Sequence, residues 1–244
     1  MKRINAIGKS ILVIGDTHIP FQHVDSWRWL AAIKKKYLNK KSIIIHIGDE
    51  VDGHNMSFHQ NEIDIPFSPS SELEAAIDTM HMKGGLHELF PKLILLDSNH
   101  GSLIFRRAKF GGIPLHYLKG LKDVYKTPKW NWHDEVQIKT GPRDIYVCHG
   151  RSSANGKLAG SLGISTIQGH YHSKFGITWY SNGSESRFCA YTGCLIDDKN
   201  LAFSYGRLSI AKPILGSVLI TEDGTPRLFK MTLTKDNRWD GKLP

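Results

Sequence analysis

The sequence predicts an α/β fold, in which helices connect the strands of a largely parallel sheet. Two observations lead to this class. Short apolar runs rich in β-branched residues, typical of strands buried on both faces, recur through the first 170 residues. Segments with apolar residues at helical spacing separate the early runs, and this alternation is typical of strand–helix–strand crossover units.

The strands are expected where five apolar runs occur, and each run is followed closely by Asp, Asn or His. In chain order the expected strands are residues 10–14, 42–47, 92–96, 144–148 and 165–168. The polar residues that follow them are Asp16 and His18, then Asp49, then Asn99 and His100, then His149, and finally His170 and His172. Because ligands bind outside the carboxyl ends of strands in open α/β sheets, we expect these side chains to converge at one sheet edge.

Two helices are expected between the early strands. Asp25 is placed to cap the first, and the Ser71-x-x-Glu74 pattern predicts a capping box at the start of the second. Residues 101–135 have the least regular pattern and predict a loop-rich insertion beside the site.

The pattern changes after about residue 175, where turn signals separate short alternating runs. Ser-Asn-Gly at 181–183 and Glu-Asp-Gly at 222–224 are typical of hairpin turns. The last third of the chain is therefore expected to form antiparallel strands that pack with the first sheet.

Composition limits the class of protein. Of the 244 residues, 40% are hydrophobic and 23% are charged, as in soluble globular proteins. The length fits a single domain over residues 1–244, and no apolar run approaches the ~20 residues of a membrane helix, so we expect no membrane partner. Three cysteines without a Cys-x-x-Cys pair predict neither a disulfide framework nor a thiolate zinc site, and they indicate a reducing, cytoplasmic location.

The chain is basic, with 32 Lys and Arg against 23 Asp and Glu and a formal charge of +9. This excess favours an anionic partner, with nucleotides or nucleic acid first, although solubility alone explains it equally well. The sequence leaves the oligomeric state open.

The polar residues after the strands predict a metal centre when they are taken together. Singly, an Asp after a strand often caps a helix, and a lone His is often a hydrogen-bonded loop residue. Together, several carboxylates in a small volume would repel each other without cations, and two bound metal ions remove that problem. Carboxylate, amide and imidazole ligands without thiolate suit manganese, with iron or zinc as alternatives.

These residues stand in five ordered motifs that resemble those of the calcineurin-like metallophosphoesterases. The motifs are Gly15-Asp-Thr-His18, Gly48-Asp49, Ser98-Asn-His100, His149-Gly150 and Gly169-His-Tyr-His172. With Gly112-Ile-Pro114 and Trp130-Asn-Trp-His-Asp-Glu135, the chain is also similar to short phage-encoded phosphoesterases. The resemblance implies a four-layer α-β-β-α sandwich of two mixed sheets flanked by helices, and metal-dependent hydrolysis of phosphoric esters.

The resemblance also implies a role for each motif residue. His100 would be the catalytic histidine that orients the phosphate and assists the leaving oxygen, and Asp49 would bridge two metal ions. Asp16, His18 and His172 would hold the first ion, and Asn99, His149 and His170 the second.

Three features depart from the family pattern. Ser98 stands where a glycine is usual. Gly101 replaces the acidic residue that usually follows the catalytic histidine, so the partner that orients His100 must be another group, either Asp97 or a backbone carbonyl. The segment after Asp49 lacks the Asp-Arg-Gly ending of the Ser/Thr protein phosphatases, which argues against a phosphoprotein substrate.

Other polar residues near the motifs have two interpretations each. Glu50, Asp52 and His54 either support the metal ligands or face solvent. Arg106 and Arg151 are expected to bind substrate phosphate through the fork of the guanidinium group, with a solvated surface as the alternative.

The expected function is hydrolysis of nucleotide-type phosphate esters. Because the basic residues are spread along the chain, the sequence favours a nucleoside 5′-monophosphate phosphatase. The alternative is a phosphodiesterase or nuclease similar to the DNA-repair exonucleases, and a non-catalytic metal-bound scaffold ranks last.

Overall fold

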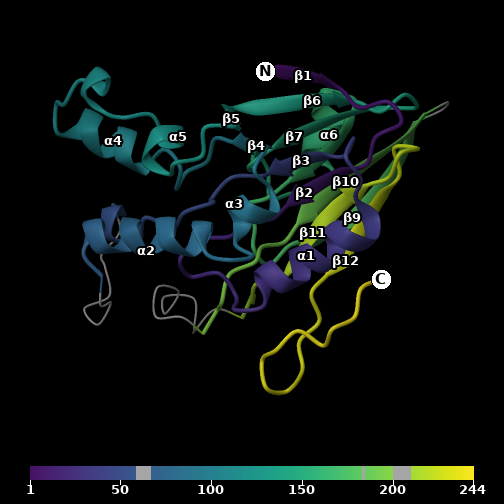
Figure 1. The fold of residues 1–244 in the computed structure, drawn as a ribbon. Coiled ribbons are helices and arrows are strands. Elements are labelled where there is room, and N and C mark those ends of the chain that lie inside the picture. Colours follow the sequence, from purple (N-terminus) through teal and green to yellow (C-terminus); the bar gives the residue numbers. More distant parts are fainter. Residues whose placement is uncertain (59–66, 183–184, 200–209) are drawn as a thin grey trace.

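The computed structural model describes residues 1–58, 67–182, 185–199 and 210–244. Two mixed sheets of six strands each stack face to face, and helices cover their outer faces (Figure 1). This arrangement confirms the expected four-layer α-β-β-α sandwich.

The first sheet contains three of the five expected strands, at its centre. Strands β2 to β5 run parallel, and the antiparallel pair β11 and β12 extends the sheet beside β2. The order is β12 (Pro226–Lys230), β11 (Gly216–Ile220), β2 (Ile11–Ile14), β3 (Ile43–His46), β4 (Leu93–Leu96) and β5 (Trp130–His133).

The second sheet contains the other two expected strands, β7 and β8, which are parallel neighbours. The expectation of one shared sheet edge is therefore wrong: the ligand-bearing strands divide between two sheets, whose edges meet at the site. The order is β1 (Lys2–Asn5), β6 (Glu135–Lys139), β7 (Asp144–Cys148), β8 (Ser165–Gln168), β10 (Glu185–Thr192) and β9 (Phe175–Asn182).

Alternate side chains of β2 belong to two different cores. Ile11 and Val13 are fully buried in the layer between the two sheets, whereas Leu12 and Ile14 are fully buried under the outer helices. Burial on both faces explains why this strand is apolar at every position.

Helices lie on both outer faces, and two more belong to the segment between β4 and β5. The outer layer over the first sheet contains α1 (Ser26–Tyr37), α2 (Pro69–His81) and α3 (Leu86–Leu89), while α6 (Lys157–Leu162) packs against β10 of the second sheet. The remaining helices are α4 (Leu103–Phe110), α5 (Leu121–Val124) and the 3-10 turns η1 (His54–Met56) and η2 (Leu115–Tyr117).

The second helix begins earlier than expected. The Ser68 hydroxyl accepts from the Ser71 N–H at 3.2 Å, and the Ser71 hydroxyl accepts from the Ser68 N–H at 2.8 Å. The capping box therefore joins Ser68 to Ser71 and not Ser71 to Glu74. Pro69 occupies the first helical turn, where its fixed φ favours the helix and its missing N–H costs nothing.

The segment 101–135 is more regular than the sequence predicts. It contains α4, α5 and the edge strand β5. Trp130, the first residue of β5, is buried in the core, and its indole N–H donates to the Phe90 carbonyl at 2.9 Å. In contrast, both expected hairpin pairings are confirmed: β9 pairs with β10, and Gly224 donates to Thr221 in the turn between β11 and β12. Gly183, in the first of these turns, lies outside the described residues.

Asp25 immediately precedes α1, but its side chain does not cap the helix. The buried carboxylate instead accepts from Arg238 Nε at 2.8 Å, from Arg238 Nη2 at 2.7 Å and from the Trp239 N–H at 2.9 Å. Hydrogen bonding by Arg238 holds the pKa of Asp25 well below its usual range. Asp25 thus fastens the C-terminal segment to the start of α1.

The Asp25→Asn variant should lower the free energy of unfolding by about 1.5–3 kcal/mol at neutral pH, because it removes charge-assisted hydrogen bonds from a buried site. A lowered folded-state pKa stabilises the fold only while the group is ionised, so the difference should shrink as the pH falls below about 4. Urea unfolding at several pH values measures this, with the exposed Asp236→Asn as control. A difference that does not depend on pH would contradict the assignment.

In the described part of the chain, no helix is both long and apolar enough to cross a membrane.

Candidate metal centre

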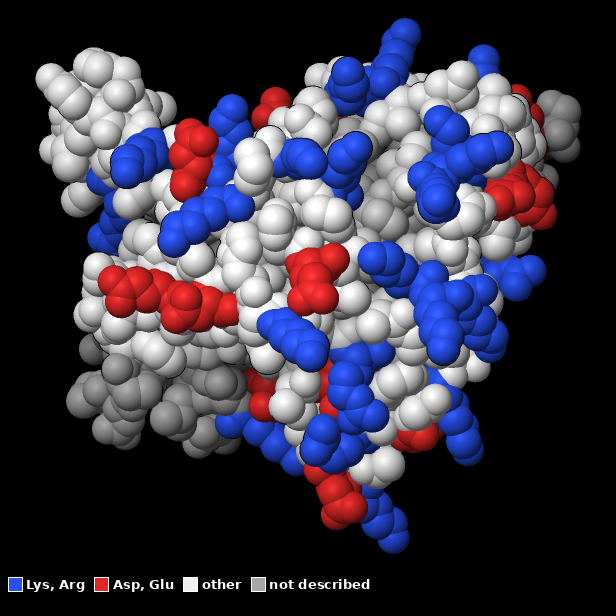
Figure 2. All heavy atoms as spheres, viewed as in Figure 1, with Lys and Arg blue, Asp and Glu red and all other residues white. Residues whose placement is uncertain are grey.

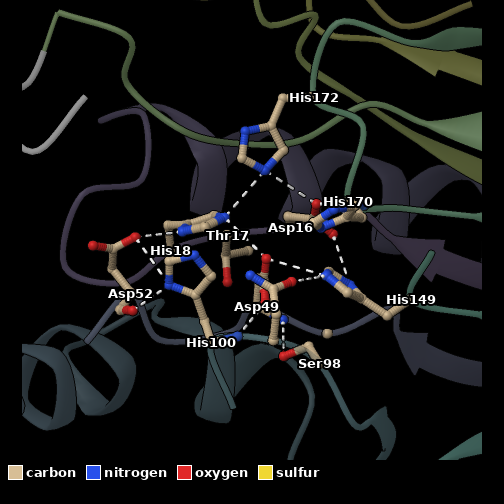
Figure 3. A network of polar contacts seen from close by, with 12 residues as sticks. Asp16, Thr17, His18, Asp49, Asp52, Ser98, His100, His149, His170 and His172 are labelled. Atoms are coloured by element: carbon tan, nitrogen blue, oxygen red, sulfur yellow. Dashed lines mark hydrogen bonds and ion pairs between the residues drawn. The ribbon is translucent and has the colours of Figure 1, made fainter. Parts of the chain in front are cut away.

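The predicted ligand side chains meet where the carboxyl ends of β2, β3, β4, β7 and β8 approach one another (Figure 3). Two groups of possible metal ligands share Asp49, and in each group the ligand atoms lie within 4.8 Å of one another. The first group is Asp16, His18, Asp49 and His172, and the second is Asp49, His149 and His170.

The first group is held together by short distances between ring nitrogens and carboxylate oxygens. His172 Nε2 lies 3.2 Å from both Asp16 Oδ2 and His18 Nε2. His18 Nε2 lies 3.5 Å from Asp49 Oδ2. These atoms face a common point, as ligands of a single cation would.

The second group gains a further oxygen from Asn99. His149 Nε2 lies 3.2 Å from Asp49 Oδ2 and 2.8 Å from Asn99 Oδ1. The other ring nitrogen, Nδ1, donates to the Ile47 carbonyl at 3.1 Å, which keeps Nε2 directed into the site. All seven side chains expected to hold metal are thus brought together, with Asp49 common to both groups.

The chemistry of these donors fits two divalent cations. Asp16 Oδ1 is buried and accepts no hydrogen bond from any described residue, and His149 Nδ1 lies 3.8 Å from it. Burial lowers the pKa of His149, but Asp49 and Asp16 outweigh burial and raise it to about 9. The cluster therefore attracts positive charge, and carboxylate, amide and imidazole donors without thiolate suit manganese, iron or zinc.

Close approach of the loops requires glycine beside the ligands. Gly48 has φ +113°, and a Cβ there would lie 2.7 Å from the Ser98 Cβ and 2.8 Å from His149 Nδ1. A Cβ at Gly169 would lie 2.6 Å from Asp16 Oδ1. At both positions a side chain would push the ligand loops apart.

Ser98, which replaces the usual glycine, links two of these loops. Its hydroxyl oxygen accepts from the Asp49 N–H and from the Gly101 N–H, both at 2.9 Å. The departure from the family pattern therefore supports the position of Asp49.

His100 is fixed by two contacts. Its backbone N–H donates to Asp49 Oδ1 at 3.1 Å, and its Nδ1 donates to the Asp52 carbonyl in a short hydrogen bond. The orienting partner is thus a backbone carbonyl, one of the two expected alternatives, whereas Asp97 lines the adjacent pocket. Burial lowers the pKa of His100, but the carboxylates of Asp49 and Asp52 raise it above its ordinary value, which favours the protonated ring.

Asp52 supports the site from behind. Its buried carboxylate lies 2.5 Å from His18 Nδ1 and 3.6 Å from His100 Nδ1. His54 Nδ1 lies 3.8 Å from the same carboxylate. The sequence allows two interpretations of Asp52, as a support for the metal ligands or as a solvent-facing residue. Its burial and its contact with His18 favour the support of a candidate ligand.

The Asp52→Asn variant should weaken manganese binding or activity about 10–100-fold, because the amide keeps the size of the side chain but loses the charge that orients His18. Calorimetric titration with manganese and initial rates measure the two effects. Asp123→Asn, on the distant α5, is the control. Wild-type affinity together with wild-type rate in Asp52→Asn would show that the contact is dispensable.

Glu50 places a carboxyl group near Gly101, the position where the family pattern has an acidic residue. A Cβ added at Gly101 would lie 3.6 Å from Glu50 Oε2, so a carboxyl group still borders this turn, although it comes from the loop after β3. Burial raises the pKa of Glu50 to about 8. The sequence alone does not show that Glu50 lies near Gly101, because the two residues are far apart along the chain.

A pocket of about 450 Å³ adjoins the second ligand group. Arg106 and Arg151, both expected to bind substrate, line it together with Asn99, His149 and His170. Arg106 Nη2 donates to the backbone carbonyl of Asn99 at 2.6 Å, and Arg151 Nη2 donates to the Glu135 carboxylate at 2.8 Å.

No curated protein matches the chain. Among solved structures, a novel archaeal phosphodiesterase is 15% identical, with a TM-score of 0.45 over 90% of this chain and 98% of that chain. A serine/threonine phosphatase from Saccharomyces cerevisiae is 11% identical, with a TM-score of 0.44 over 97% of this chain and 85% of that chain.

The sequence profile of the calcineurin-like phosphoesterases matches residues 9–205, a range that contains all five motifs. The chain therefore belongs to the calcineurin-like phosphoesterase family and is a metal-dependent phosphoester hydrolase.

Proposed function

We propose that the protein hydrolyses phosphate monoesters of nucleotides, with nucleoside 5′-monophosphates as the simplest substrates. The observation that carries this proposal is the pocket beside the ligand cluster. Its volume of about 450 Å³ lies within the range of small-molecule sites, and two arginines line it next to Asn99 and His149. One phosphate and one nucleoside account for such a pocket.

The ligand assignment follows the two groups and their shared carboxylate. When bound, two divalent ions supply charge neutralisation at the phosphoryl group and activation of water for in-line attack. We propose manganese as the metal, with iron or zinc as alternatives. Asp16, His18 and His172 would hold the first ion, Asn99, His149 and His170 the second, and Asp49 both.

His100 acts on the ester oxygen in this proposal. Because Nδ1 is bound to the Asp52 carbonyl, Nε2 is the ring nitrogen left for substrate. The nearby carboxylates favour the protonated ring, so Nε2–H can orient the phosphate and deliver a proton to the leaving oxygen.

Arg151 and Arg106 bind the non-bridging phosphate oxygens in this proposal. Glu135 holds the Arg151 guanidinium and also accepts a short hydrogen bond from the Tyr146 hydroxyl. These two residues position Arg151 at the mouth of the pocket without touching substrate themselves.

A phosphodiesterase or nuclease is the second candidate. The basic residues on α4, directly after His100, favour it. A metal-bound scaffold without activity ranks last, because all the ligands expected from the family pattern are present.

A substrate panel in manganese tests the proposal. We expect inorganic phosphate from nucleoside 5′-monophosphates, while single-stranded DNA keeps its length on a denaturing gel. The panel also contains a nitrophenyl diester and a cyclic nucleotide, and His100→Ala serves as the control for contaminating phosphatases. Shortened DNA without released phosphate would replace the monoesterase with the nuclease.

A further inference from the structure

The segment 101–126, here called the basic arm, projects from the sandwich with helices α4 and α5 (Figure 1). It carries six Lys and Arg and a single acidic residue, an excess of five out of the +9 of the whole chain. These six basic side chains therefore belong to one projecting segment. They are Arg106, Arg107, Lys109, Lys119, Lys122 and Lys126, with Asp123 as the acidic residue.

Aromatic rings are exposed among these cations. Phe110 is 81% exposed and Tyr117 is 75% exposed. The Phe58 ring lies 6.0 Å from the Phe110 ring, and the Arg107 guanidinium lies 4.1 Å from the centre of Phe58. Exposed rings among cations are the features by which proteins stack and hold single-stranded nucleic acid. In Figure 2 the tip of this projection is uncharged, and Lys and Arg side chains lie at its base.

The arm is continuous with the proposed active site. Helix α4 begins three residues after His100, and Arg106 on this helix lines the pocket beside the metal ligands. Arg107 Nε donates to the Met56 carbonyl at 2.7 Å, which fastens the base of the arm to the loop after β3. Phe110, the last residue of α4, and Tyr117, the last residue of η2, follow Arg106 along the arm.

We propose that the basic arm binds single-stranded nucleic acid and presents its terminal phosphate monoester to the pocket. The inference rests on the proposed function and names its substrate class, the phosphorylated end of a strand. The charge of the arm complements the phosphate backbone, and its rings offer stacking surfaces to unpaired bases.

A second basic surface supplies the control. A hollow of about 660 Å³ is lined by five lysines and lies where the chain enters β3, β4 and β5, at the opposite ends of the strands from the metal ligands. Among the described residues that line it, the only aromatic side chain is the buried Phe90. Its lysines are Lys34, Lys35, Lys40, Lys92 and Lys129.

Binding of a fluorescein-labelled, unphosphorylated single-stranded DNA to the manganese-loaded protein tests the proposal by anisotropy. This probe has no terminal monoester, so binding is separated from the proposed reaction. The Phe110→Ala/Tyr117→Ala variant should bind at least about tenfold more weakly, because base stacking is lost. Matched melting temperatures and circular dichroism spectra show that the variants are folded.

Charge reversal separates the arm from the other lysine surface. Lys109→Glu/Lys122→Glu should weaken binding and reduce its dependence on salt, because fewer phosphates are neutralised. Lys35→Glu/Lys40→Glu makes the same change of charge at the remote hollow and should leave the affinity near that of the wild type. Equal weakening by both pairs would overturn the assignment to the arm.

Activity provides the second readout. In both arm variants, phosphate release from a nucleoside 5′-monophosphate should be unchanged, while KM for a 5′-phosphorylated strand rises. Unchanged DNA affinity in the arm variants would overturn the proposal. If DNA binding depends on the arm but no monoester is hydrolysed, the binding surface stands, and the proposed function and the presentation of a terminal phosphate both fail.

Discussion

The Asp49→Asn variant should lose at least one metal ion and several orders of magnitude in activity. Asp49 Oδ2 lies 3.5 Å from His18 Nε2 and 3.2 Å from His149 Nε2, so one carboxylate serves both ligand groups. Its other oxygen accepts the His100 N–H at 3.1 Å. An amide keeps the shape of the side chain but removes the negative charge that would hold the two proposed cations.

Metal content by mass spectrometry and initial rates measure this loss, with the distant Asp123→Asn as control. Two full equivalents of metal in an active Asp49→Asn protein would refute the bridging role.

The His100→Ala variant should lose roughly 10²–10⁴-fold in rate while its metal content stays near normal. The adjacent Asn99 supplies the oxygen beside His149, whereas His100 Nδ1 is bound to the Asp52 carbonyl. In the proposed mechanism His100 acts on the substrate and is not a metal ligand. An ester with a good leaving group needs less proton donation and should recover part of the lost rate.

Paired measurements of metal content in His100→Ala and Asn99→Ala give the control. If both variants lose metal equally, His100 is a ligand and its catalytic role is wrong.

The sequence predicts which side chains converge, because sheet geometry restricts where strand ends can go. The chain leaves a buried strand such as β2 at its carboxyl end, and the next polar residue, Asp16, therefore lies at that end of the sheet. There it is fully buried among the other candidate ligands. Five such strand ends, in the order of the family motifs, leave few other choices for the residues of the site. The division of the five strands between two sheets was not expected from their patterns, because parallel neighbours such as β7 and β8 resemble β2 and β3 in composition.

The groups behind the ligands could not be predicted, because they depend on how separate loops meet. Asp52 contacts His18 and His100 across 34 and 48 residues of sequence. Glu50 takes the place of an acidic residue expected near Gly101, which belongs to a different loop.

Local patterns also gave a wrong cap for α1 and a wrong start for α2. Asp25 precedes α1 as a capping residue would, but Arg238, near the other end of the chain, provides a stronger partner. For α2, the Ser-Pro pair at the true start forms the box with Ser71, whereas the sequence pattern indicated Ser71 with Glu74. For α1 the competing contact joins residues far apart in sequence, whereas for α2 it joins residues only three positions apart.

The most direct test of the account is phosphate release from a nucleoside 5′-monophosphate by protein stripped of metal with EDTA and then titrated with manganese. The two ligand groups that share Asp49 predict no hydrolysis in the stripped protein and recovery that is complete at two equivalents of manganese. Hydrolysis that persists after the metal has been removed would contradict the account, because the buried carboxylates and imidazoles would then have another purpose.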